Sequence, residues 1–204
     1  MIEIFVHRAI FENKENSLEG IEFWLKSGFN IEIDVRKNKQ EIYLSHEKQK
    51  NGDLFRDACK IIKQNSKKVA IHIKENFDMR CVTDLIHEFD IGKKCFIFST
   101  LQNYDKIKKM ENISYASYQN NVQNIGNSNI IWCDESNEIW YDKKIFSKYK
   151  KNQKTIIVMS KELLKNSNLM EIHNEWKRLI NLEVDGICTD YPFDLMRYRD
   201  ENII

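Results

Sequence analysis

Eight short apolar runs, separated by stretches of a different periodicity, constrain the fold of this chain more than any other feature of its sequence. The runs lie at residues 2–6, 30–35, 69–73, 95–99, 113–117, 129–133, 155–159 and 184–189. Near-continuous apolar runs of this length are typical of strands buried on both faces. Between the first two runs, residues 17–26 carry apolar side chains at helical spacing and Gly28 follows them, which predicts a helix that ends before the next strand. The chain thus begins with a strand–helix–strand unit, which implies parallel strands.

The same alternation continues to the end of the chain. We expect further helices at residues 54–63, 79–89, 103–110, 119–126, 143–149 and 163–181, and a last helix that begins at Pro192. Eight strands that each precede a helix predict an α/β fold of the (β/α)8, or TIM-barrel, class. A length of 204 residues is close to the lower limit for one such barrel, so we expect a single domain over residues 1–204. Residues 41–45 form an additional apolar run, interpreted as a β extension of the second strand or of its loop.

The charge balance gives no reason to expect a polyanionic partner. Lysine and arginine number 32 and aspartate and glutamate 31, which leaves a formal net charge of +1. The basic stretch at residues 143–154 has few interleaved aromatic residues, so it is interpreted as a solvated helix face and not as a nucleic-acid site. No apolar run is long enough to span a membrane and the N-terminus lacks a secretory pattern, so we expect a cytoplasmic protein. The sequence does not indicate an oligomeric state.

Five cysteines are scattered along the chain without the C-x-x-C spacing of metal or redox sites. Their odd number, and the places of three of them in apolar runs, predict reduced thiols.

Polar side chains gather where the first strands end. His7 and Arg8 follow the first apolar run, and His46 follows the additional run. Glu32 and Asp34 occupy alternate positions of the second run, so both side chains point to one face, with Cα atoms roughly 6–7 Å apart. Two carboxylates in this arrangement suit one hard cation.

The third predicted strand contributes His72 and Lys74, again at alternate positions. In (β/α)8 barrels the active site is built from side chains at the carboxyl ends of the strands. We therefore expect these residues to meet at one end of the barrel.

The motifs and their order resemble the glycerophosphodiester phosphodiesterases, within the wider barrel superfamily that includes phosphatidylinositol-specific phospholipase C. The resemblance covers both ends of the chain. It is carried by His7 and Arg8, by Glu15, Asn16 and Ser17, by residues 31–35, by His46 and Glu47, and by the sequence VDGICTDYP at residues 184–192.

The resemblance implies a phosphoric diester hydrolase that depends on a divalent metal, acts on a small soluble glycerophosphodiester-like substrate and belongs to lipid metabolism. It implies that His7 and His46 are the general acid and base, that Glu32 and Asp34 bind the metal, and that Arg8 binds the phosphate.

The third strand departs from the family pattern. Where the family has a Glu-x-Lys pair whose glutamate is a third acidic metal ligand, this chain has His72-x-Lys74. Lys74 offers a point charge to the phosphate, whereas His72 either completes the metal site or hydrogen-bonds the phosphate. The oxygen ligands favour Mg²⁺ or Ca²⁺, and Mn²⁺ or Zn²⁺ would accept an imidazole more readily. In addition, Ala9 replaces a family glycine, and the segment after His46 lacks the family insertion, which predicts a more open site.

The same residue types suit phosphodiester hydrolysis on chemical grounds. Arg8 offers a fork of donors that matches two phosphate oxygens, and the two histidines titrate near neutrality. We expect an in-line displacement in which one histidine deprotonates water, or a neighbouring substrate hydroxyl, while the other protonates the leaving group.

Alternatives remain open at this point. Attack by a substrate hydroxyl would make the protein a phosphodiester cyclase or lyase of the phospholipase type, which releases a cyclic phosphate. A barrel that had lost turnover would be a non-catalytic phosphate-binding module. The histidines could be bonded to backbone carbonyls, Lys74 could be a surface lysine, and Trp140 and Tyr141 could contact substrate or pack on the next helix. Glu32 and Asp34 could form a structural network with Arg8, Arg36 or Lys74.

Overall fold

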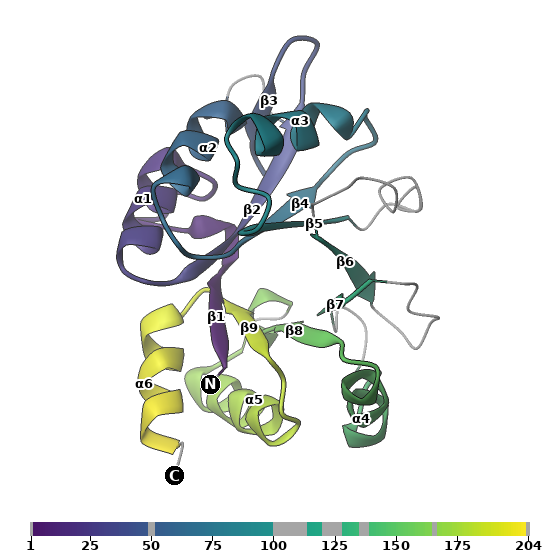
Figure 1. Ribbon diagram of the computed structural model, residues 1–204. Helices are drawn as coiled ribbons and strands as arrows, with labels where there is room; N and C mark the ends of the chain where they lie inside the picture. Colours follow the sequence, from purple (N-terminus) through teal and green to yellow (C-terminus); the bar gives the residue numbers. More distant parts are fainter. Residues whose placement is uncertain are drawn as a thin grey trace. The chain divides into compact units, whose positions relative to one another are not determined.

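The computed structural model describes residues 2–48, 52–99, 114–119, 128–134, 139–164 and 167–202 (Figure 1). The strands are β1 (Glu3–Val6), β2 (Asn30–Lys37), β3 (Ile42–Leu44), β4 (Val69–Ile73), β5 (Cys95–Ser99), β6 (Ser114–Gln119), β7 (Ile130–Cys133), β8 (Thr155–Met159) and β9 (Gly186–Thr189). The α-helices are α1 (Leu18–Lys26), α2 (Phe55–Lys63), α3 (Arg80–Glu88), α4 (Lys143–Lys151), α5 (Leu169–Asn181) and α6 (Pro192–Asn202). Short 3₁₀ helices lie at η1 (His7–Ala9) and η3 (Lys161–Leu163).

The strands pair in the order β1-β9-β8-β7-β6-β5-β4-β2-β3, and β1 also pairs with β2. Consecutive strands from β4 to β9 are parallel, as are β2 and β4. The short β3 pairs antiparallel with β2, with Leu44 opposite Val35. Apart from β3, this is the closed, eight-stranded parallel barrel of the (β/α)8 class, so the predicted fold class is confirmed. The additional run at residues 41–45 is the predicted β extension.

By its internal contacts the chain divides into two compact units, one of Val6–Tyr115 and one that combines Met1–Phe5 with Ala116–Ile204. In the first unit, α1 packs on α2 and β2, and α2 packs on α3 and β3 (Figure 1). Ile31 and Ile33 of β2 are fully buried, and so is Ile71 of β4. The alternate positions of β2, Glu32 and Asp34, are also buried. Since successive side chains of a strand point to opposite faces, β2 has an apolar face and a polar face that are both shielded from water.

Helix α1 holds the chain that follows β1. The side chain of Ser17 caps the helix by accepting a hydrogen bond from the Gly20 N–H at 3.1 Å, and Gly28, at φ +88°, lies just beyond its end. Trp24 donates its indole N–H to the carbonyl of Ile10 at 2.7 Å. A Cβ at Gly20 would lie 2.2 Å from the carbonyl oxygen of Ala9, so glycine is required for η1 to approach the helix this closely.

In the second unit, the predicted helix at residues 163–181 begins too early. Asn168 is extended, with φ −78° and ψ 164°, and its side chain accepts a hydrogen bond from the Glu171 N–H at 3.0 Å. Glu171 accepts in return from the Asn168 N–H at 3.1 Å. This capping box starts α5 at Leu169, and residues Lys161–Leu163 form the separate turn η3.

Trp140 and Tyr141 pack beside the helix that follows them. Both are buried, Tyr141 stacks on Phe146 of α4 with ring centroids 4.4 Å apart, and Trp140 donates its indole N–H to the carbonyl of Asp134 at 2.6 Å. Tyr141 thus packs on the following helix, as one of the two alternatives predicted, and Trp140 packs against Tyr141.

The predicted helices at residues 103–110 and 119–126 lie outside the described residues, except that Gln119 ends β6. No α-helix of the described ranges has the length and apolar character needed to cross a membrane. The five cysteines all lie in the described part of the chain and are free thiols, as predicted.

Candidate functional site

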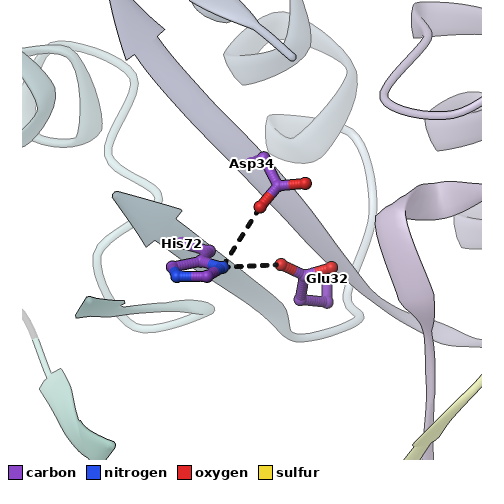
Figure 2. Close-up of side chains that lie close together, drawn as sticks. All are labelled: Glu32, Asp34 and His72. Carbon is purple, nitrogen blue, oxygen red and sulfur yellow. Dashed lines mark ion pairs between the residues drawn. The ribbon is translucent and has the colours of Figure 1, made fainter. Parts of the chain in front are cut away.

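The polar face of β2 and its neighbour β4 bring three potential metal ligands together. Asp34 is paired with His72 in the register of the two parallel strands, and Glu32 lies two residues before Asp34 on the same face. Figure 2 shows the imidazole of His72 directed at both carboxylates, with its Nδ1 atom 3.1 Å from Asp34 Oδ1 and 3.7 Å from Glu32 Oε1. The carboxylates are 1% and 2% exposed, which is rare for acidic residues without a compensating charge.

This group of Glu32, Asp34 and His72 fits a divalent cation. One ligand atom of each residue lies within 4.8 Å of the others. Atoms that bind a cation at about 2.1–2.2 Å and at right angles lie about 3.0–3.1 Å from each other. The separation of His72 Nδ1 and Asp34 Oδ1, 3.1 Å, has that value, and the separation of His72 Nδ1 and Glu32 Oε1, 3.7 Å, is somewhat longer, so the three ligand atoms would have to move together to share one ion.

The raised pKa of Glu32 also favours a bound cation at this group. Burial raises the pKa of Glu32 to about 7, and the charge of Asp34 adds to this effect. The charge of His7, the backbone N–H of Arg8 and the Arg8 guanidinium act in the opposite direction without outweighing burial. The neighbouring positive charges and the backbone N–H therefore do not offset the cost of burying the ionised carboxylate of Glu32. A bound cation would stabilise this ionised form.

His72 is held in place by an aromatic neighbour. Its ring stacks on Phe98 of β5, with centroids 4.4 Å apart and planes inclined by 15°. Nε2 of His72 is buried and has no hydrogen-bond partner among the described residues. Burial lowers the pKa of His72, against the hydrogen bond and charge of Asp34 that raise it. A neutral imidazole is the form that binds metals.

Arg8 reaches this group from the turn η1. The residue has a left-handed backbone, with φ 50° and ψ 22°, and its N–H donates to Glu32 Oε2 at 2.9 Å. Its Nη1 pairs with Glu15 Oε2 at 2.7 Å, and its Nε lies 3.6 Å from Asp34 Oδ2. The backbone turn thus fixes one carboxylate while the guanidinium lies beside the other.

Asn16 is a part of the site that the sequence did not reveal as such. Its side-chain N–H donates to Asp34 Oδ2 at 3.0 Å, and its side-chain oxygen accepts from the Asp34 backbone N–H at 2.8 Å. The signal that could have identified its role is its place in the Glu15-Asn16-Ser17 motif, which carries part of the family resemblance. Two hydrogen bonds to one buried residue fix the orientation of the Asp34 carboxylate.

Lys74 continues β4 toward the same group. Its Nζ lies 3.7 Å from Asp34 Oδ1, and its side chain is 16% exposed, so it is not a surface lysine. Burial alone would raise the pKa of Asp34, but the hydrogen bond and charge of His72, together with Lys74 and Asn16, hold this pKa well below its ordinary value. Asp34 is accordingly ionised, and His72, Lys74 and Asn16 stabilise its negative charge.

The two histidines proposed for proton transfer occupy the same unit. His46 lies beyond β3, and its Nδ1 is 2.7 Å from the carboxylate of Glu47 and not bonded to a backbone carbonyl. Burial lowers the pKa of His46 and the charge of Lys74 adds to the lowering. His7 begins η1, where its charge acts on Glu32.

The structure thus gathers the predicted residues of the first unit around Glu32 and Asp34. The network alternative is partly realised, since Arg8 and Lys74 do lie beside Asp34. Arg36 does not join it and pairs instead with Glu75.

A second buried polar group lies in the other unit, and its central residue was missed. The carboxylate of Glu162 accepts hydrogen bonds from the hydroxyls of Ser160 and Thr189 and from the Asp190 N–H at 3.3 Å. Ser160 accepts in turn from the indole N–H of Trp176 at 2.8 Å. This carboxylate ties the segments after β8 and β9 together, and a single glutamate in a polar loop gave no sequence signal for it.

No protein-family model and no curated protein sequence matches this chain. Solved structures do. A glycerophosphodiester phosphodiesterase from Agrobacterium tumefaciens str. C58 aligns with a TM-score of 0.73 at 18% identity, over 98% of this chain and 100% of that one. A glycerophosphodiester phosphodiesterase from Parabacteroides distasonis ATCC 8503 aligns with a TM-score of 0.76 at 12% identity, over 100% and 98%. A Ca²⁺-dependent phosphatidylinositol-specific phospholipase C from Streptomyces antibioticus aligns with a TM-score of 0.63 at 10% identity, over 95% of each chain. This chain therefore has the fold of these phosphodiesterases, and the predicted resemblance is confirmed at the level of the fold.

Proposed function

We propose that this protein is a metal-dependent phosphoric diester hydrolase that acts on a small, soluble phosphodiester of the glycerophosphodiester type. The observation that carries the proposal is the environment of Asp34, a buried carboxylate with His72, Arg8 and Lys74 at 3.1, 3.6 and 3.7 Å. A carboxylate pair for a cation and two basic side chains for a phosphate meet here in one place. The fold shared with known phosphodiesterases supports the same reaction class.

In this proposal Glu32, Asp34 and His72 hold the metal, which when bound supplies a Lewis acid for the phosphoryl oxygens. Arg8 and Lys74 bind the same phosphate by charge and hydrogen bonds, the first as a fork and the second as a point charge. Both therefore stabilise the negative charge that develops during in-line attack.

His46 is the better candidate for the general base. Its lowered pKa leaves the imidazole neutral at neutral pH, and Glu47 engages Nδ1, so Nε2 is the atom that would take a proton from water. His7 is then the general acid that protonates the leaving alkoxide. His7 begins η1, and its charge acts on Glu32, which places it beside the proposed metal ligands.

The test is a turnover screen of the purified protein with glycerophosphodiesters, bis-p-nitrophenyl phosphate and nucleotide diphosphate-linked alcohols, each with Mg²⁺, Ca²⁺ or Mn²⁺. We expect metal-dependent cleavage of a glycerophosphodiester. His7→Ala and His46→Ala should each reduce kcat by about 10²–10⁴-fold. Near-normal turnover by both variants would contradict the assignment of the two histidines.

The other candidate functions are outcomes of the same screen. Phosphorus NMR of the first product separates hydrolysis from cyclisation, since a cyclic phosphate has its own chemical shift. Binding of phosphodiesters without turnover under every condition would favour a non-catalytic phosphate-binding barrel.

A further inference from the structure

One arginine of the site region makes no contact with Glu32 or Asp34 and instead holds the backbone of His46. Arg36 donates from Nε and Nη2 to the His46 carbonyl oxygen, at 3.0 and 2.7 Å. Its Nη1 lies 3.4 Å from Glu75 Oε2, and the other oxygen of Glu75 accepts the Lys37 N–H at 2.8 Å. The side chains of Arg36 and Glu75 are 13% and 23% exposed, so both are largely shielded from water.

Arg36 and Glu75 lie at the ends of the two strands that carry the candidate metal ligands. Arg36 follows Asp34 by two residues on β2, so the two side chains leave the strand on the same face. Glu75 directly follows Lys74 at the end of β4. The pair thus connects the ends of the two strands that carry the carboxylates and Lys74 to the segment that carries His46.

We propose that Arg36, supported by Glu75, is a positioning residue that sets where the His46 imidazole stands relative to Asp34 and Lys74. This inference rests on the proposed function, in which His46 transfers a proton. Glu47 holds the imidazole at Nδ1 and Arg36 holds the carbonyl of the same residue, so His46 is fixed at both its side chain and its backbone. Because two of its donors bind one backbone oxygen and a third faces Glu75, Arg36 positions the base and does not bind the phosphate.

Lysine cannot replace arginine in this role. A planar guanidinium presents parallel N–H donors from Nε and Nη2 and a further one from Nη1, whereas an ammonium is a single point on a flexible stem. Arg36→Lys therefore keeps the positive charge but loses the paired donation to the His46 carbonyl oxygen. A displacement of a catalytic group by about 1 Å can reduce a rate by roughly 10²-fold.

The experiment compares Arg36→Lys and Glu75→Gln with a control, Arg56→Lys. Arg56 lies in the same unit and forms a two-point ion pair with Glu88, including a 2.9 Å contact from Nη2, and its side chain is 46% exposed. We expect Arg36→Lys to lower kcat by about 10–100-fold with KM changed by less than about threefold. Glu75→Gln should have a smaller effect of the same kind, and Arg56→Lys should change neither constant.

A double variant separates positioning from other roles. In a His46→Ala background, Arg36→Lys should cause no additional loss of kcat, because the group on which it acts is gone. A rise in KM at constant kcat, or a full additional loss in the His46→Ala background, would overturn the proposal by showing that Arg36 binds substrate or acts independently.

The proposal can also be tested if the protein turns over no substrate, which would defeat the proposed function. NMR of the ring protons of His46 should then show a changed chemical shift and titration midpoint in Arg36→Lys, and wild-type values in Arg56→Lys. Unchanged His46 resonances in Arg36→Lys would overturn the positioning role whatever the fate of the proposed function.

Discussion

The imidazole of His72 and the ring of Phe98 are stacked, with centroids 4.4 Å apart, and the stack presents Nδ1 of His72 to Asp34 Oδ1 at 3.1 Å. The third donor of the candidate metal site is therefore a nitrogen fixed in direction. Calcium and magnesium prefer oxygen ligands, whereas manganese and zinc accept nitrogen more readily.

The first prediction concerns this nitrogen. His72→Glu should raise the affinity for Ca²⁺ and Mg²⁺ relative to Mn²⁺ by roughly tenfold, the scale on which changes around a metal alter its affinity. Isothermal titration of the protein with each metal measures the ratio. Phe98→Leu is the control, because it loosens the ring without changing the donor atom and should weaken all three metals alike. An unchanged ratio in His72→Glu would mean that His72 is not a ligand.

Asn16 should contribute to both stability and metal affinity. Asn16→Ala leaves the Asp34 N–H and one carboxylate oxygen without their partners in a buried place, which costs about 1–3 kcal/mol in the free energy of unfolding. The metal affinity should fall by roughly 10–100-fold, because Asp34 loses the group that orients it. Urea denaturation and metal titration are the measurements. Asn30→Ala, which removes a hydrogen bond from the Lys68 N–H at an exposed position, should change stability by less and metal affinity not at all.

Gly20→Ala should destabilise the protein although it lies within a helix. Alanine in place of glycine ordinarily stabilises a helix by about 1 kcal/mol. Here the new Cβ would lie 2.2 Å from the Ala9 carbonyl oxygen, so η1, with His7 and Arg8, would have to move. We expect a lower melting temperature together with reduced turnover. Glu22→Ala on the exposed face of α1 is the matched control, and equal melting temperatures for the two variants would contradict the close contact seen at Gly20.

Glu162→Gln should lower the free energy of unfolding by about 1–3 kcal/mol. The hydroxyls of Ser160 and Thr189 now donate to the carboxylate, and in the variant one of them would face an amide N–H, which cannot accept a hydrogen bond. Glu183→Gln, at an exposed residue, should have no such effect. Chemical denaturation of both variants at one pH provides the comparison.

The same residue predicts a pH dependence. Burial raises the pKa of Glu162 above its ordinary value of 4.5, and the hydrogen bonds from Ser160 and Thr189 oppose this only in part. Since the folded-state pKa is the higher one, the contribution of Glu162 to stability is present below pH 4.5 and is lost as the pH rises through the folded-state value. The difference in unfolding free energy between wild type and Glu162→Gln, measured from pH 4 to pH 7, should therefore become less favourable to wild type as the pH rises. If the stability advantage of wild type over Glu162→Gln instead grew with pH, the hydrogen bonds to the ionised carboxylate would outweigh the effect of burial on its pKa.

The cysteines should differ in reactivity. Burial raises the pKa of Cys59 to about 12 and raises that of Cys95 as well, whereas Cys81 is partly exposed on α3. Because the thiolate is the reactive form, a thiol reagent at pH 8 should label Cys81 first and Cys59 and Cys95 only on unfolding. Mass spectrometry of peptides after timed labelling gives the order, and early labelling of Cys59 would contradict its burial.

The sequence was sufficient for the fold because its signals were local and repeated. Apolar runs and caps such as Ser17 and Gly28 depend on neighbouring residues alone, and they predicted the strands and α1 within a few residues. The predicted helix at residues 163–181 was wrong at its start, since Leu163 and Leu164 continue an apolar pattern while the capping box at Asn168 determines where the helix begins.

The candidate site was predictable where its residues lie at strand ends and only in part elsewhere. Glu32, Asp34 and His72 follow from the alternation of β2 and β4. The roles of Asn16, Arg36 and Glu162 depend on contacts between segments distant in sequence, and no periodicity encodes a hydrogen bond from Arg36 to the carbonyl of His46. Their polar character is also that of ordinary loop residues.

The loop between β1 and α1 has one more consequence, for attempts to make this protein more thermostable. Arg8, Ala9, Glu12, Asn13 and Asn16 all have positive φ, between 44° and 62°. Residues other than glycine and asparagine lose roughly 1–2 kcal/mol each in this conformation, so the loop holds conformational energy that the rest of the chain must offset. Replacements by glycine would release part of that energy, yet they would also loosen the backbone that directs the Arg8 N–H at Glu32. Glycine replacements that stabilise the protein would therefore fall in the loop whose rigid backbone orients the Arg8 N–H. A screen for thermostability without an activity assay would select variants with an impaired site.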